Sequence, residues 1–411
     1  MNVFRTFDVQ LRRNLLILFT AGLLFWSSLA LLLPTLPLYI DEAVGASKQQ
    51  IGIIIGSFAI GMLISRPMLG RLADERGRKL VLLIGTAVVA IAPLGYLLVK
   101  SIPMLMVLRA FHGISIAAFG TAFMALVADL APERQRGEVI GYMSLVNPIG
   151  VAIGPALGGY LQASAGYTPL FLVSAGLGGV AILFMLQIVN PPIDDLQPTN
   201  TPKNQFWQIL ISPRVRVPMI VLSLVGLALG AVHSFLPLFI KSTGVDLNVG
   251  LFFTAAALAS FSVRVFTGRA SDKYGRGLFI TISLICYAVA ILLIWKANNT
   301  FVFLLAGLIE GAGSGTVIPM IAAMMTDRAL PHERGRIFGV SLMGFDVGIA
   351  IAGPVFGAIA EKIGYRDMFG VVTGFSFLAI LIFLTQSGKN LSNSLRFAIG
   401  RAQDAYSLNK L

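Results

Sequence analysis

Long apolar runs separated by short polar connections occupy most of this chain. An apolar run of roughly 20 residues is long enough to cross the hydrocarbon core of a bilayer as a helix. The runs do not alternate apolar and polar positions, so they predict helices and not the strands of a barrel. The pattern predicts an all-α membrane protein with twelve transmembrane helices, at about 14–40, 50–69, 79–99, 103–128, 138–163, 168–189, 216–241, 248–268, 277–296, 301–326, 336–362 and 367–388.

The first run, 14–40, follows a basic segment, which is also how a secretion signal begins. This run is too long for the apolar part of such a signal, and no obvious cleavage site follows it. We therefore expect it to be the first membrane span.

A polar motif occurs once in each half of the chain. Gly70–Arg78 and Gly268–Arg276 both read G-x-x-x-D-x-x-G-R, and they start 198 residues apart. The same offset relates further pairs, namely Arg66 and Arg264, Gly113 and Gly311, Asp129 and Asp327, Arg136-Gly137 and Arg334-Gly335, Gly141 and Gly339, and Gly166-Tyr167 and Gly364-Tyr365. The offset predicts two parallel six-helix repeats, an architecture found among secondary transporters.

The repeats set the expected domains. We expect an N-terminal half at 1–190, a cytoplasmic linker at 191–213, a C-terminal half at 214–388 and a cytoplasmic tail at 389–411. The linker is too short to be a domain. For the tail two alternatives stay open, a segment without regular structure and a basic interfacial helix presenting Leu391, Leu395, Phe397 and Ile399.

Composition and charge agree with a membrane location and give an orientation. Hydrophobic residues make up 56% and charged residues 12% of the chain, which is too little polar surface for a soluble protein of 411 residues. Of the 31 Lys and Arg, 24 lie at the termini and in the even-to-odd connections, and six lie in the other loops. This bias predicts a cell inner (plasma) membrane protein with both termini in the cytoplasm. It also explains the net charge of +12 without a nucleic-acid partner, because no basic soluble domain is present.

Several kinds of chemistry are not expected from the residue inventory. The single cysteine, Cys286, forms neither an intramolecular disulfide nor a thiolate cluster, and His112, His233 and His332 lack metal-ligand spacing. The chain has no G-x-x-x-x-G-K-[ST] phosphate loop. We therefore expect no metal and no cofactor, and an ion gradient as the source of energy.

The repeated motif has residue types that suit a short charged turn between two helices. Gly77 and Gly275 permit the reversal, and an arginine at the end of each motif is placed to reach an aspartate at the end of the fourth or the tenth span. The plainer alternative is that these charges only mark the cytoplasmic loops. The residues of this candidate cytoplasmic gate are Gly70, Asp74, Gly77, Arg78, Asp129, Gly268, Asp272, Gly275, Arg276 and Asp327.

With two copies of this motif and twelve spans, the chain resembles the major facilitator superfamily, in its twelve-span drug:proton antiporter branch. The resemblance extends from about 10 to 390. It implies that the aspartate and the final arginine of the motif belong to a charge network that holds the two halves together on the cytoplasmic side. Those roles would fall on Asp74, Arg78 and Asp129, with Asp272, Arg276 and Asp327 as the second copy.

The fifth span carries a glycine pattern, Gly150-x-x-x-Gly154-Pro155-x-x-Gly158-Gly159. Glycines at this spacing form a smooth helical face for close packing, and Pro155 removes a backbone hydrogen bond. Ordinary packing of small residues is the alternative. The pattern resembles the family's antiporter signature, which is found in exporters more than in importers. The second half has only Gly353-Pro354-x-x-Gly357 at the corresponding place.

The fourth span contains Arg109 and His112, three residues apart. An arginine deep in a span costs roughly 2.5–3.5 kcal/mol on insertion scales, so Arg109 is expected to face water or a partner. The family has such an arginine, linked to proton transfer, but it more often has glutamine where this chain has His112. His112 is therefore either a packed neutral histidine or, with Trp26, part of a substrate cavity.

Two acids in the second half are candidates for proton coupling. Glu310 lies in the tenth span and Asp346 in the eleventh, where neither can face lipid as a carboxylate. Burial favours the protonated form of a carboxyl group, which suits a proton carrier. A structural acid satisfied by Arg109 or by backbone groups is the alternative, and His233 in the seventh span is a weaker candidate.

These features predict a secondary active transporter that exchanges protons for a small amphipathic organic molecule by alternating access and works as a monomer. A proton symporter that imports a metabolite is the nearest alternative. A membrane-embedded enzyme is a remote alternative, because no nucleophile or metal constellation accompanies the two acids.

Overall fold

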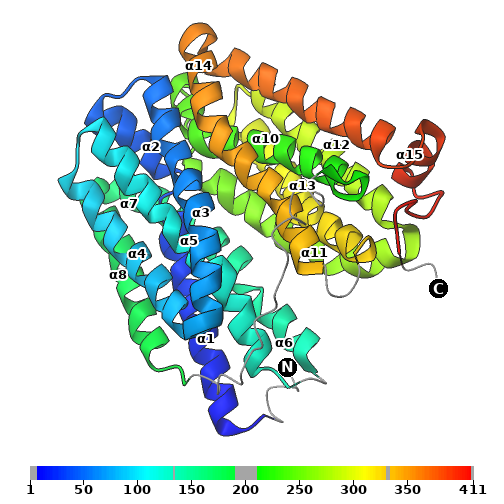
Figure 1. The fold of residues 1–411 in the computed structure, drawn as a ribbon. Coiled ribbons are helices and arrows are strands. Elements are labelled where there is room, and N and C mark those ends of the chain that lie inside the picture. Colours follow the sequence, from blue (N-terminus) through cyan, green and yellow to red (C-terminus); the bar gives the residue numbers. More distant parts are fainter. Residues whose placement is uncertain (1–6, 133–134, 190–210, 330–333, 409–411) are drawn as a thin grey trace. The chain divides into compact units, whose positions relative to one another are not determined.

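The structure is a computed structural model that describes residues 7–132, 135–189, 211–329 and 334–408. All the elements among these residues are helical (Figure 1). The helices of the first half are α1 (Val9–Leu31), α2 (Thr35–Tyr39), the π-helix η2 (Ile40–Val44), α3 (Lys48–Arg76), α4 (Arg78–Leu98), α5 (Ile102–Leu130), α6 (Arg136–Met143), α7 (Val146–Ala165) and α8 (Tyr167–Leu186).

The second half continues the all-helical pattern. It contains α10 (Pro213–Thr243), α11 (Val249–Tyr274), α12 (Arg276–Lys296), α13 (Thr300–Asp327), α14 (Arg334–Gln386) and α15 (Leu391–Ala398). Gly364 interrupts α14 with φ 84°, so this element is two helices joined at a sharp bend.

The structure confirms the twelve-span fold. Ten helices of the described residues are long and apolar enough to cross a membrane when α14 is taken as one. Dividing α14 at Gly364 adds one span, and α11, whose apolar part Val249–Arg264 is shorter, adds another. Large apolar side chains on the span surfaces are exposed, among them Leu98 and Val107 at 85% and 71%, as expected for faces in contact with lipid.

The chain divides into two compact units. Unit 1 comprises Met1–Ala46, Ile53–Thr199 and Asn248–Thr254, and unit 2 comprises Ser47–Gly52, Asn200–Leu247 and Ala255–Leu411. The domain limits expected at 190 and 214 stay a prediction, and most of the expected linker lies outside the described residues.

Each unit has its own helix packing. In unit 1, α1 lies against α7 and α8, and α4 lies against α5 and α8. In unit 2, α10 lies against α14, and α12 lies against α13 and α14. Stacked rings fill the interior, as where Phe25 lies 4.0 Å from Phe119 between ring centroids.

The repeat is visible in the backbone. Gly77 separates α3 from α4 with φ 94°, and Gly275 separates α11 from α12 with φ 92°. A residue with a Cβ atom is strained in this region, so the turn needs glycine at both places. Each turn carries the arginine that opens the next helix, which places Arg78 and Arg276 at equivalent helix starts.

Candidate functional site

The first motif turn holds a cluster of one arginine and two aspartates. Arg78 Nη1 donates to Asp74 Oδ1 at 2.6 Å and to the Ala73 carbonyl at 2.6 Å. Arg78 Nε lies 3.5 Å from Asp129 Oδ2. These contacts join the end of α3, the start of α4 and the end of α5. We call Asp74, Arg78 and Asp129 the first motif cluster.

The second motif turn holds the equivalent pair. Arg276 Nε lies 2.6 Å from Asp327 Oδ2, and Arg276 Nη2 donates to Asp327 Oδ1 at 3.3 Å. This fork engages both carboxylate oxygens, a geometry that makes an ion pair more specific. We call Arg276 and Asp327 the second motif cluster. Gly268 and Asp272 lie in α11, and their side-chain surroundings are outside the described part of the chain.

The aspartates of the two clusters differ in exposure. The Asp74 and Asp129 side chains are 71% and 44% exposed, whereas that of Asp327 is 25% exposed. Water screens exposed ion pairs, so the first cluster contributes little to folding stability. Gly70 faces open space in α3, so packing does not require a glycine there.

The glycine pattern of α7 lies against α1. A Cβ atom at Gly150 would come within 2.5 Å of Trp26 Cβ, and one at Gly154 within 2.7 Å of Ala30 Cβ. A Cβ atom at Gly158 would collide with the carbonyl oxygen of Leu31. The two helix backbones therefore approach as closely as glycine allows.

The last two members of the pattern have separate surroundings. Gly159 faces the side chain of Asn248, and Pro155 lies inside α7, where it is buried. Trp26 is half-buried in α1 and packs edge-to-face on Phe25 at 5.6 Å and on Phe119 at 6.3 Å. Its ring belongs to an aromatic cluster of unit 1.

Arg109 and His112 lie together in the interior of unit 1. Arg109 is 8% exposed, and its guanidinium carbon lies 4.3 Å from the centre of the Phe58 ring. His112 is completely buried, with its Nδ1 atom 3.4 Å from Arg109 Nη1 and 3.2 Å from the Tyr96 hydroxyl. Sequence reasoning missed Tyr96, which no motif marks.

The contact between Arg109 and His112 has a defined direction. Arginine only donates, so the 3.4 Å contact from Arg109 Nη1 suits His112 Nδ1 as the acceptor. Both His112 Nε2 and Arg109 Nε are buried without a hydrogen-bond partner among the described residues. Within the same part of the chain, no ion pair joins Arg109 to a carboxylate.

The two acids lie in the interior of unit 2. Glu310 in α13 and Asp346 in α14 are each 5% exposed. The hydroxyl groups of Tyr287 and Ser314 lie beside the Glu310 carboxyl, yet Glu310 Oε1 has no hydrogen-bond partner in the described structure. His233 is half-buried in α10. Tyr287 is a second residue that sequence reasoning missed.

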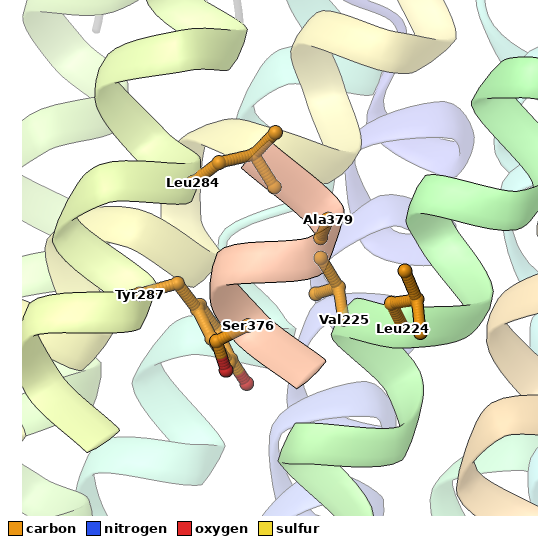
Figure 2. Close-up of a pocket in the computed structure, with 6 residues that line it drawn as sticks. All are labelled: Leu224, Val225, Leu284, Tyr287, Ser376 and Ala379. Carbon is orange, nitrogen blue, oxygen red and sulfur yellow. The ribbon is translucent and has the colours of Figure 1, made fainter. Parts of the chain in front are cut away.

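A narrow crevice in unit 2 lies at Tyr287. Its walls come from three helices, α10, α12 and α14, and Figure 2 shows the lining residues Leu224, Val225, Leu284, Tyr287, Ser376 and Ala379. The crevice is too narrow to hold a water molecule. It is mostly apolar, with the Tyr287 and Ser376 hydroxyls as its polar groups.

We find no group of three metal-ligating side chains within the described ranges. His112 and His233 lie in different units, and His332 lies outside the described residues.

Known proteins resemble this chain along most of its length. The chain is 25% identical over 376 residues to the multidrug resistance protein MdtG of Serratia proteamaculans, covering 88% of this chain and 91% of that protein. It is 26% identical over 374 residues to the multi-drug resistance efflux pump PmrA homolog of Lactococcus lactis, covering 88% and 92%. The crystal structure of the nucleoside transporter NupG (D323A mutant) superposes with a TM-score of 0.80 at 15% identity, covering 89% of this chain and 98% of that one.

The family assignment rests on the sequence profile together with the fold. The profile of the Major Facilitator Superfamily matches residues 18–269 and 246–398, which span both halves and both motif turns. This twelve-helix, multi-pass membrane protein belongs to the Major Facilitator Superfamily.

Proposed function

We propose that this protein is a proton-coupled exporter of a small amphipathic organic molecule. Its relatives include proteins named as multidrug resistance and efflux proteins, and the α7 glycine face matches a pattern typical of exporters. Transport proceeds by alternating access, with the substrate leaving the cytoplasm while protons enter. Within the described ranges, neither Glu310 nor Asp346 lies in a group of residues that could form a catalytic nucleophile site or a metal site. The proposal therefore includes no enzymatic activity.

The burial of Glu310 carries the proton-coupling part of the proposal. This carboxyl is 5% exposed in a transmembrane helix, and Oε1 is without a partner among the described residues. None of the ion pairs in this part of the chain involves Glu310. An unpaired carboxylate in such a site is costly, so the protonated acid is favoured there. A group that is neutral when enclosed and ionised when wet can carry a proton across the membrane.

The motif clusters supply the gate of this proposal. They stabilise the closed cytoplasmic side while the substrate site faces outward, and they separate when the cytoplasmic side opens. The charge pattern supports an orientation with both termini in the cytoplasm of a bacterial-type inner membrane. One chain contains both repeats, so we propose a functional monomer.

The free energy of a proton gradient is large enough to drive substrate accumulation. One charge that crosses the membrane down 100 mV releases about 2.3 kcal/mol. A factor of ten in concentration corresponds to about 1.4 kcal/mol. One proton at 100 mV therefore supports an accumulation of more than tenfold.

Transport into everted membrane vesicles tests the proposal. Vesicles with and without the protein are acidified inside by respiration, and a panel of lipophilic fluorescent dyes and anionic amphiphiles is added outside. We expect protein-dependent accumulation of at least one compound, abolished by a protonophore. Accumulation only in right-side-out vesicles with acid outside would indicate a symporter and overturn the export proposal.

A further inference from the structure

The tail does not end at α15. Residues Ile399–Leu408 follow that helix and return to the end of α13, within unit 2. Arg328, directly after α13, is completely buried. Its Nε atom donates to Asp404 Oδ2 at 2.6 Å, and its Nη2 atom donates to Asp404 Oδ1 at 3.0 Å. A bidentate pair therefore joins the tail to the tenth span.

Arg328 also contacts two other segments and a second residue of the tail. Its Nη1 atom donates to the Arg214 carbonyl at 2.8 Å, and its Nη2 atom donates to the Ser387 carbonyl at 3.1 Å. The guanidinium carbon lies 5.1 Å from the centre of the Tyr406 ring. Within the described ranges, Asp404 is the carboxylate that compensates the charge of Arg328. Removal of the Asp404 charge would leave a buried guanidinium uncompensated.

The same segment contacts the second motif cluster. The Leu408 amide donates to the Asp327 carbonyl at 2.9 Å, and the carboxylate of that aspartate holds Arg276 at 2.6 Å. Two consecutive residues at the C-terminal end of α13, Asp327 and Arg328, thus bind the motif arginine and the tail.

The tail also contacts the arginine side of this cluster. Gly400 lies close to the start of α12, because a Cβ atom at Gly400 would come within 3.2 Å of Leu278 Cβ. The preceding helix α15 adds a contact, in which Thr281 Oγ1 donates to the Ala398 carbonyl at 2.9 Å. The tail therefore contacts both the start of α12 and the end of α13.

The first half has no arginine at the equivalent position. At the repeat offset of 198 residues, the position of Arg328 corresponds to Leu130. A leucine cannot bind a carboxylate, so no counterpart of the Arg328–Asp404 pair forms at this position. The side chain of Asp129 is 44% exposed and that of Asp327 is 25% exposed.

We propose that Ile399–Leu408 is a positioning element for the second motif cluster. Asp404 binds Arg328 and thereby holds the end of α13 in the position where Asp327 pairs with Arg276. This inference rests on the proposed function for the role of that cluster in transport. The structural part, the coupling of the tail to the pair, holds independently of the transported substrate.

Amide hydrogen exchange of the purified full-length protein tests the coupling without a substrate. Asp404→Asn keeps the shape of the side chain and removes its charge. It should raise amide exchange at the end of α13 and the start of α12, and Arg276→Gln should raise it in the same two places. Arg401→Gln is the matched control, because that exposed tail arginine forms no ion pair within the described ranges. Faster exchange confined to 399–408 would overturn the proposal.

A second variant keeps the test valid if Asp404→Asn does not fold. Leu408→Pro removes the amide that donates to the Asp327 carbonyl, and the buried charge pair stays intact. It should raise exchange at the end of α13 to a smaller extent. No change there, with normal accumulation in the membrane, would contradict the proposal.

Transport kinetics test the positioning role. Asp404→Asn should lower the maximal rate of substrate exchange several-fold with KM nearly unchanged, and Asp404→Glu should restore most of the rate. In an Asp327→Asn background, Asp404→Asn should have no further effect, because the pair that it positions is already broken. Equal fold effects in both backgrounds would show that the tail only stabilises the fold. If the parent protein itself showed no gradient-driven accumulation while Asp404→Asn still raised amide exchange at the end of α13, the proposed function would fail and the structural coupling would stand.

Discussion

At the scale of single residues, Glu310 is the most informative side chain of unit 2. Its position in the tenth span is readable from the sequence, because an acid inside an apolar run is conspicuous. The proximity of Ser314 follows from helical spacing, because it lies four residues further along the same helix. The proximity of Tyr287 is not readable, since Tyr287 lies in another helix and belongs to no motif. A local sequence pattern identifies a charged residue whose burial costs free energy, but it does not identify the residues from other helices that surround it.

Glu310→Gln should uncouple transport from the proton gradient. Glutamine mimics the neutral acid, so the site stays neutral throughout the cycle. We expect substrate exchange across vesicle membranes at near the parental rate and loss of accumulation driven by a pH gradient. Asp346→Asn is the comparison, because Asp346 is equally buried. Retention of pH-driven accumulation by both variants would place coupling elsewhere, with His233 the next group to test.

The gate prediction also belongs to this scale. Asp74→Asn removes the charge that Arg78 binds at 2.6 Å, and an exposed ion pair of this kind contributes about 1 kcal/mol at most. We therefore expect unchanged membrane insertion and a transport rate reduced about fivefold, the factor that about 1 kcal/mol gives. Glu75→Gln is the control, because it removes a neighbouring acid that pairs with the exposed Arg71. Parental transport by Asp74→Asn at equal expression would refute the gate role.

At the scale of elements, the apolar runs locate the helices better than they locate the helix ends. The second run is apolar over 50–69, but α3 spans Lys48–Arg76. Hydropathy reports which part of a helix meets lipid, whereas the polar last turn stays helical because its backbone hydrogen bonds continue. The motif aspartate Asp74 lies in that turn.

The α7 glycine face gives a packing prediction. A Cβ atom at Gly154 would meet the backbone of α1 at the Ser27 carbonyl oxygen and the Leu31 amide nitrogen, at 2.8 and 2.9 Å. Gly154→Ala should therefore lower stability by about 1–3 kcal/mol, the usual cost of overpacking. Thermal unfolding in detergent measures this as a lower Tm.

A control glycine makes that result specific. A Cβ atom added at Gly176 in α8 would have no neighbouring atom within 4 Å in the described structure, so Gly176→Ala should leave Tm unchanged or slightly higher. The larger Gly154→Leu should abolish transport or cause proton leak. Full activity without leak would show that the face is not closely packed in the membrane.

At the scale of the whole molecule, the apolar runs predict the number of spans, and the repeat of 198 residues predicts their division into two similar halves. The tail contact is beyond such reasoning. Arg328 and Asp404 are 76 residues apart and outside both motif copies. Only the fold brings them together, so a sequence pattern gives no reason to pair them.

Proton movement during transport tests the central claim most directly. In everted vesicles with an acidic interior, reported by a pH-sensitive dye, addition of a transported compound outside should release protons and raise the internal pH. Vesicles without the protein should show no change. Transport of the compound with no pH change would contradict proton-coupled export, as would further acidification of the interior.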